Sequence, residues 1–224
     1  MVLASPMAHD TWTWTLNWSV IRETIVVGSC PMTTRDIDCI RKETRASALL
    51  SVQTDLCRAA FDIDWGVHLR HAAKRGILLV NAPMRDFDPP EQRRRLPDAV
   101  RCLSRLLNRG ERVYVYCTAG INRSPLTVLG YLTFIEGMAP EQASALIKAA
   151  RPQAEPYWEA YYGCRQDLVD LCRDAIERRA WDLAKAEPES APESHWIRAE
   201  KEIIRDVFLA TASAPDSRLD PSRS

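Results

Sequence analysis

Apolar and polar positions alternate along the chain in blocks that predict strands and helices in turn. Short apolar runs of strand length lie at 25–28, 48–52, 77–80 and 113–116. Amphipathic or mostly apolar runs of helical length lie at about 34–43, 65–75, 90–108, 125–136, 140–150 and 157–184. This order predicts an α/β fold in which a central, mostly parallel sheet is flanked by helices.

The pattern also predicts where the domain ends. Residues 16–185 are expected to form one domain, whose edge is capped by a tryptophan-rich segment at 11–23. A polar, proline-bearing linker follows, and residues 186–210 combine it with one more amphipathic helix that packs on the domain. The last residues, 211–224, are polar and are predicted to be disordered.

Composition excludes several classes of function. The net charge is zero, which gives no overall field to attract nucleic acid or an anionic membrane. No apolar run approaches membrane-spanning length. The seven cysteines are scattered without CxxC pairs, which favours free thiols in a reducing compartment. With no clear targeting segment, we predict a cytoplasmic protein and leave a plastid location open.

The most informative stretch is Cys117-Thr-Ala-Gly-Ile-Asn-Arg-Ser-Pro125. A strand at 113–116 runs into a tight loop that opens a helix, so loop N–H groups and a helix N-terminus point at one place. Gly120 stands where the backbone comes close to a ligand, and Ser124-Pro125 opens the helix. A cysteine at the start of such an anion site and an arginine at its end predict hydrolysis of phosphate esters.

Each residue type fits one step of that chemistry. A Cys117 thiolate would attack phosphorus, and its pKa would be lowered by the loop dipoles and Arg123. The planar guanidinium of Arg123 can hold two phosphate oxygens, and the Ser124 hydroxyl can help sulfur leave. The other oxygens would meet the N–H groups of the phosphate loop, which contains Thr118, Ala119, Gly120, Ile121 and Asn122.

A general acid is expected on a second loop above the phosphate. Arg85-Asp-Phe-Asp-Pro89 follows the third predicted strand and precedes the helix at 90–108. Either Asp86 or Asp88 could protonate the leaving oxygen and then activate water. No metal or organic cofactor is needed. His68 and His71 lie three residues apart on a predicted helix, but no third ligand accompanies them, and a solvated helix face explains both.

These segments together resemble the cysteine-dependent dual-specificity phosphatases and, more narrowly, the plant glucan phosphatases of the starch-excess type. The resemblance runs from about residue 16 to 210. It rests on the segment from Leu16 to Cys30, the acid loop with Arg95-Leu-Pro97, the phosphate loop, and a C-terminal stretch from Ala175 to Ala184 with the helix after Trp196. It implies a phosphatase that acts on a phosphorylated α-glucan, starch-like or glycogen-like, through a cysteinyl-phosphate intermediate.

The resemblance also implies roles for individual residues. It assigns the general acid to Asp86, and it places the aromatic residues Trp18, Trp65 and Phe87 in a channel that stacks on sugar rings. Tyr116 stands where the family usually has a histidine, and Asn122 stands where it usually has a glycine. Residues 153–174 include an additional aromatic stretch, Tyr157-Trp-Glu-Ala-Tyr-Tyr162. Its rings could extend a glucan-binding surface or pack an added helix, and we favour packing.

Two alternative functions remain open on the sequence alone. The same loop serves a protein phosphatase that acts on phosphotyrosine or phosphoserine and phosphothreonine. The changes at Tyr116 and Asn122 also allow a catalytically weak scaffold that binds phosphoglucan.

Overall fold

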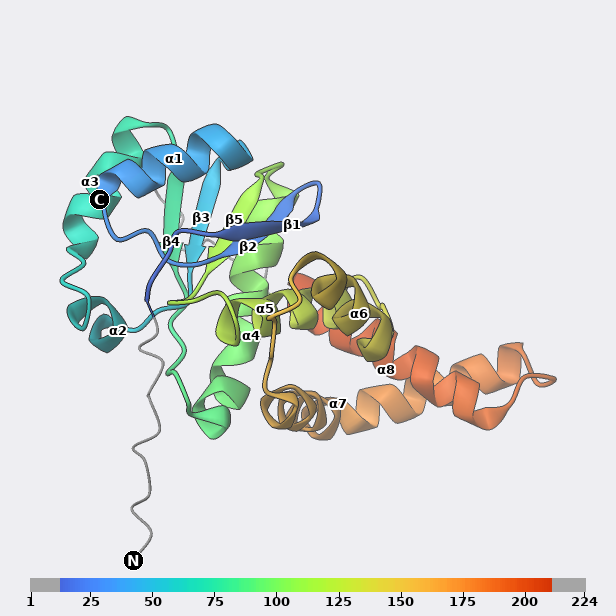
Figure 1. Cartoon of the computed structure of the whole chain (residues 1–224). Helices are drawn as coiled ribbons and strands as arrows, with labels where there is room; N and C mark the ends of the chain where they lie inside the picture. Colours follow the sequence, from blue (N-terminus) through green and yellow to red (C-terminus); the bar gives the residue numbers. More distant parts are fainter. Residues whose placement is uncertain (1–12, 211–224) are drawn as a thin grey trace, which may run out of the picture.

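Five strands form one sheet at the centre of the computed structural model, which describes residues 13–210 (Figure 1). The strands are β1 (Trp18–Arg22), β2 (Ile25–Gly28), β3 (Ala48–Ser51), β4 (Leu78–Asn81) and β5 (Val113–Tyr116). Their spatial order is β1-β2-β5-β3-β4. Only β1 runs antiparallel to its neighbour, and the other pairs are parallel. The predicted fold class is confirmed.

The parallel pairing brings the ends of four strands to one edge of the sheet. Gly28 and Ser51 both pair with Tyr116, the last residue of β5, and Ser51 also pairs with Asn81, the last residue of β4. Ligand sites in open α/β sheets form at this carboxyl edge, where the loops to the next helices begin. The loops after β4 and β5 both start there.

Side chains alternate between the two faces of the sheet and build two separate cores. Val26, Leu49 and Tyr114 face a smaller core that is covered by α1 (Thr34–Thr44) and α3 (Trp65–Lys74). Val27, Leu50 and Val115 face the larger core. The helices that contribute to this core include α4 (Pro89–Asn108), α5 (Arg123–Gly130), the short helix η1 (Tyr131–Ile135) and α6 (Pro140–Ala150).

Local sequence accounts for where these helices begin. Thr33 caps α1 in a reciprocal capping box with Asp36, so Thr33 rather than Thr34 is the cap. Asp88 caps α4 by accepting a hydrogen bond from the Glu91 N–H at 2.9 Å, and Pro89 and Pro90 occupy the first helical turn.

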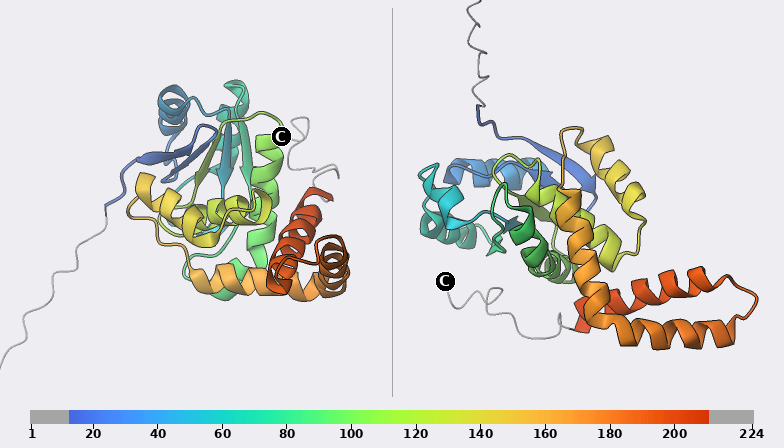
Figure 2. Two further views of the ribbon diagram at one scale, coloured as in Figure 1. Left: turned by 90° about the vertical axis from the view of Figure 1, so that its right-hand side faces the viewer. Right: turned by 90° about the horizontal axis from the view of Figure 1, so that it is seen from below.

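The C-terminal part of the described chain is a helical hairpin. It consists of α7 (Trp158–Ala186) and α8 (Pro192–Ala210), which pack along each other. The first part of α7 lies against α4, α8 contacts η1, and the turn of the hairpin points away from the sheet (Figures 1 and 2). Phe208 anchors the end of α8 by stacking on Phe134 at a centroid distance of 5.7 Å. The predicted disordered segment 211–224 lies outside the described residues.

Several local features differ from the sequence-based expectations. The tryptophan-rich segment contains the edge strand β1, and a short helix, α2 (Asp55–Ala59), follows β3. The helix predicted at 125–136 changes to a π-helical turn at η1. His68 is buried rather than solvated, and burial lowers its pKa, whereas His71 bonds the Asp38 carboxylate at 3.0 Å. None of the helices between residues 13 and 210 is both long and apolar enough to cross a bilayer.

Candidate active site

The loop between β5 and α5 folds tightly around the Cys117 sulfur. Gly120 adopts a φ of +70°, and a Cβ atom there would lie 2.5 Å from the Gly28 carbonyl oxygen. Both the conformation and the close approach therefore require glycine. The N–H of Gly120 points to the Cys117 sulfur at 3.2 Å. No side chain caps the N-terminus of α5, which begins at the end of this loop.

Cys117 is set up to ionise. Its burial alone opposes the charged form, but the charge of Arg123, the Ser124 hydroxyl and the N–H groups of Ser124 and Gly120 outweigh it. The net effect lowers the pKa of the Cys117 thiol below its ordinary value. The Ser124 hydroxyl donates to the sulfur at 3.4 Å. A thiolate held this way is nucleophilic near neutral pH.

Arg123 connects the phosphate loop to two other segments. Its side chain is only 1% exposed. Nη1 donates to the Met84 carbonyl at 3.1 Å and to the Cys57 sulfur at 3.2 Å. Nη2 donates to the Asp86 carboxylate at 2.5 Å and to the Thr118 hydroxyl at 3.2 Å. Within the described chain, Nε is buried without a partner, so one donor remains for a ligand.

The loop between β4 and α4 brings in the two candidate acids, and it separates their roles. Asp86 faces Arg123 and the cavity above Cys117. Asp88 caps α4 instead. Between them, Phe87 has a φ of +55° and is 82% exposed, although large aromatic side chains are usually buried.

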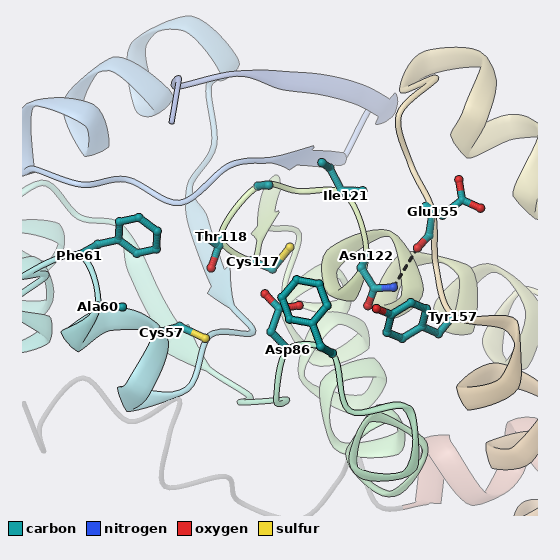
Figure 3. A pocket seen from close by; sticks show the side chains of 12 residues that line it. Cys57, Ala60, Phe61, Asp86, Cys117, Thr118, Ile121, Asn122, Glu155 and Tyr157 are labelled. Atoms are coloured by element: carbon teal, nitrogen blue, oxygen red, sulfur yellow. Dashed lines mark hydrogen bonds between the residues drawn. The ribbon is translucent and has the colours of Figure 1, made fainter. Parts of the chain in front are cut away.

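A cavity of about 630 Å³ opens above Cys117 (Figure 3). Its walls are mostly apolar. Figure 3 shows Phe61 and Tyr157 on opposite sides of the sulfur, with Asp86 beside it. The lining consists of Cys57, Ala60, Phe61, Asp86, Phe87, Cys117, Thr118, Ala119, Ile121, Asn122, Glu155 and Tyr157.

The aromatic residues predicted for glucan binding lie in different places. Phe87 lines the cavity, whereas Trp18 and Trp65 are not part of its lining. Trp18 lies on the edge strand β1 and packs against the smaller core. Trp65 begins α3, where the Arg58 guanidinium lies 4.5 Å from its ring centroid. The roles of Trp18 and Trp65 in glucan binding stay predictions.

Sequence reasoning missed three residues that contribute to this site, and it left the role of a fourth, Tyr157, open between glucan binding and packing. Phe61 and Cys57 reach the cavity from the segment after β3, and Tyr157 reaches it from the start of α7. Hydrogen bonds from the Thr54 hydroxyl and from Arg123 overcome the effect of burial and lower the pKa of Cys57. Arg151 contacts the loop from the end of α6. Cys57, Phe61 and Arg151 have no local sequence signal, because tertiary packing alone brings them to the loop. Tyr157 stands in the aromatic stretch 157–162, and the structure places it in the cavity lining.

Residues 151–157 are hydrogen-bonded to the phosphate loop. The Glu155 N–H donates to the Ile121 carbonyl at 2.7 Å, and the Asn122 side-chain amide donates to the Glu155 carbonyl at 2.8 Å. Figure 3 shows the latter bond and a Glu155 carboxylate directed away from Cys117. Asn122, in place of the usual glycine, therefore helps to hold Tyr157 beside the cavity.

Tyr116 lies on the opposite face of the sheet from Cys117. Its side chain is buried in the smaller core, and burial raises its pKa above the ordinary value. It stays a neutral phenol and adds no charge near the thiol. Among residues 13–210, no group of three potential metal ligands comes together.

The sequence matches the family described as "Dual specificity phosphatase, catalytic domain" over residues 45–160. The chain belongs to this family. The matched segment contains the acid loop, Cys117 and the 151–157 segment, so the predicted resemblance to dual-specificity phosphatases is confirmed.

Two curated relatives of this dual-specificity phosphatase are plant proteins. This chain is 30% identical over 168 residues to "Phosphoglucan phosphatase DSP4, amyloplastic" from Castanea sativa. The match covers 74% of this chain and 44% of the relative. The chain is also 30% identical over 168 residues to "Phosphoglucan phosphatase LSF1, chloroplastic" from Arabidopsis thaliana. That match covers 75% of this chain and 26% of the relative. The chain thus spans less than half the length of these relatives.

A solved structure supports the fold. The human tyrosine phosphatase-like serine/threonine/tyrosine-interacting protein superposes with a TM-score of 0.54 at 18% identity. The superposition covers 66% of this chain and 93% of that protein.

Proposed function

We propose that this protein removes phosphate from a phosphorylated α-glucan, such as starch or glycogen, through a Cys117 phospho-enzyme. The observation that carries the proposal is the cavity above Cys117, whose walls present Phe61, Phe87 and Tyr157 to a substrate. Aromatic rings suit the apolar faces of glucose units. The names of the two plant relatives support the same substrate class.

The geometry supports a two-step reaction. The Cys117 thiolate attacks phosphorus while Asp86 donates a proton to the leaving sugar oxygen, which breaks the P–O bond and forms an S–P bond. Water then attacks phosphorus and gives its proton to Asp86, and sulfur leaves as a thiolate that accepts a hydrogen bond from Ser124. Arg123 and the N–H groups of the loop stabilise the phosphoryl oxygens in both steps.

A parallel assay tests the proposal. We would measure phosphate release from phosphorylated amylopectin and from a phosphotyrosine peptide, with the wild type and with Cys117→Ser. Cys117-dependent release from amylopectin, with a higher kcat/KM than for the peptide, is expected. Release from the peptide alone would reassign the protein to protein dephosphorylation. Glucan binding without any release would identify a scaffold.

Aromatic variants test substrate recognition separately. Phe87→Ala and Tyr157→Ala should lower kcat/KM on amylopectin at least about tenfold, a loss of roughly 1.4 kcal/mol in transition-state stabilisation. They should leave a small aryl phosphate within about threefold of the wild type, because the phosphate loop is intact. Equal losses on both substrates would contradict a role in glucan recognition. Trp65→Ala, measured on the same two substrates, tests the predicted role of Trp65 in glucan binding, although Trp65 lies outside the cavity lining.

The cytoplasmic location is also a proposal. It is supported by the free cysteines, and a fluorescent fusion of the full-length protein would test it.

A further inference from the structure

Arg151 is a buried arginine that donates hydrogen bonds to the phosphate loop from outside the cavity. Its side chain is 1% exposed, and it is not among the residues that line the cavity. Its Nε donates to the Gly120 carbonyl at 2.6 Å, and its Nη2 donates to the Ala119 carbonyl at 2.9 Å. These two carbonyls are thereby held toward Arg151, which fixes the orientation of the adjoining peptide groups.

The same guanidinium ties the loop to the start of the domain. Nη2 also donates to the Asn17 side-chain oxygen at 2.7 Å, and Nη1 donates to the Val27 carbonyl at 3.5 Å. The main-chain carbonyl of Asn17 in turn accepts from the Ser29 N–H at 3.0 Å. Arg151 therefore joins the phosphate loop, strand β2 and the segment before β1.

This guanidinium lacks an acidic partner in the part of the chain that the structure describes. Its hydrogen bonds go to neutral oxygens, and desolvation by burial lowers its pKa. A buried charge without an ion pair is unfavourable by several kcal/mol unless another charge offsets it. Tyr114 and Cys117 are the two groups whose negative charge would favour the charged arginine. Burial raises the pKa of Tyr114 and keeps it neutral, which leaves the Cys117 thiolate.

We propose that Arg151 is a positioning residue for the phosphatase reaction. It fixes the Ala119 and Gly120 peptides in the phosphate-binding orientation, and its charge stabilises the anion in the loop, first the Cys117 thiolate and then the bound phosphoryl group. The proposal rests on the cysteine-phosphatase chemistry proposed above, but it does not depend on a glucan substrate.

Other groups that face Cys117 do not make Arg151 redundant. Arg123 is the second cation, but it is already paired with Asp86 and bonded to Cys57. Cys30 lies behind the loop, and its burial together with the Cys117 charge raises the pKa of Cys30 to about 12. Cys30 is therefore neutral beside the thiolate. Since Tyr116 also contributes no charge, Arg151 is the one cation near Cys117 within residues 13–210 that lacks an acidic partner.

The test compares Arg151→Met, Arg151→Lys and a control at Arg112. Arg112 is a matched control because it also donates to main-chain carbonyls, those of Thr44 and Glu23, but lies at the opposite end of β5. For each variant we would measure thermal unfolding, kcat/KM on p-nitrophenyl phosphate, and the pH dependence of iodoacetamide alkylation quantified on the Cys117 peptide.

Arg151→Met should move the alkylation midpoint of Cys117 upward by at least about one pH unit, a tenfold loss of thiolate at a fixed pH below the midpoint. Its kcat/KM on p-nitrophenyl phosphate should fall at least tenfold. Arg112→Met should keep the wild-type midpoint. A folded Arg151→Met protein with the wild-type midpoint would overturn the proposal, because Arg151 would then act in packing alone.

Arg151→Lys keeps the test decisive if the methionine variant does not fold. Lysine retains the charge but cannot bond both carbonyls with a planar fork. The midpoint should stay within about half a unit of the wild type while kcat/KM falls about tenfold. An unchanged kcat/KM, or a midpoint raised by a full unit, would contradict the proposal. Because p-nitrophenyl phosphate and the alkylation assay involve no sugar, failure of the glucan assignment would leave these results unaffected.

Discussion

Asp86 and Arg123 form an ion pair at the wall of the cavity, with the Asp86 Oδ2 atom 2.5 Å from the Arg123 Nη2 atom. Each residue is thus a hydrogen-bond partner of the other, although each has a separate role in the proposed reaction. A phosphate group that binds the guanidinium must compete with the carboxylate for Nη2. Substrate binding would therefore release Asp86 toward the leaving oxygen.

Asp86→Asn should separate binding from turnover. Turnover of a substrate with a poor leaving group should fall at least about a hundredfold, because the proton donor is lost. Inorganic phosphate should bind about two- to fivefold more tightly, the range expected when a partly exposed ion pair no longer competes. Steady-state kinetics and competitive inhibition by phosphate measure both effects.

Asp88→Asn is the control for the acid assignment. Asp88 caps α4, and Asn is nearly as good a cap, so stability and turnover should stay close to the wild type. Normal turnover in Asp86→Asn together with a large loss in Asp88→Asn would show that the acid is Asp88.

The cysteines should fall into a fast and a slow group when they are alkylated. The pKa values of Cys57 and Cys117 are lowered, whereas burial raises those of Cys30 and Cys164 to about 12. Below pH 8, iodoacetamide should therefore modify Cys57 and Cys117 at least about tenfold faster, because the thiolate is the reactive form. Peptide mass spectrometry of partly modified protein gives the order. Fast modification of Cys30 in the folded protein would show that burial does not govern the reactivity of these thiols.

The phosphate loop could be predicted from the sequence because its parts are contiguous. A four-residue apolar strand, Cys117, Gly120 and the Ser124-Pro125 helix start stand within one short segment, and each has a local physical reason. Asp86 required the family resemblance, since the acid loop alone offered two carboxylates. The structure distinguishes them, because Asp88 bonds the N-terminus of α4 and Asp86 bonds Arg123.

The residues that sequence reasoning missed reach the loop only through tertiary contacts. Arg151 stands 34 positions after Cys117 and looks like any other arginine at a helix end. Cys57 and Phe61 follow a strand that pairs with β5, a neighbour relation that only the strand order reveals. Segment similarity and aromatic character indicate Trp18 and Trp65 as glucan-binding residues, but neither criterion reports where a side chain points.

His68 should make the stability of the fold depend on pH. Burial lowers its pKa from the ordinary 6.5, although the Met32 backbone, Asp36 and Asp64 favour the charged form and His71 opposes it. The unfolded chain then takes up the proton more readily than the folded one. This contribution to stability is therefore complete above about pH 6.5 and is lost as the pH falls toward the lower, folded-state pKa. The melting temperature of His68→Gln should depend less on pH between 7 and 5 than that of the wild type. An equally steep dependence in the variant would assign it to other groups.

Phe87 combines an unfavourable backbone conformation with an exposed aromatic ring, so its substitution should affect activity and stability differently. A non-glycine residue in the left-handed region costs roughly 1–2 kcal/mol, and a ring that is 82% exposed contributes little burial in return. Strain of this kind is often found at functional sites. Phe87→Gly should consequently unfold at the same temperature as the wild type or higher, while kcat/KM on phosphorylated amylopectin falls at least about tenfold.

Phe87→Ala removes the same ring but keeps the strain, so it should match the glycine variant in activity and melt at a lower temperature. Calorimetry and phosphate release on the three proteins give both quantities. Full glucan activity in Phe87→Gly would show that the ring does not contact the substrate, and a lower melting temperature than that of Phe87→Ala would show that the backbone at this position is not strained.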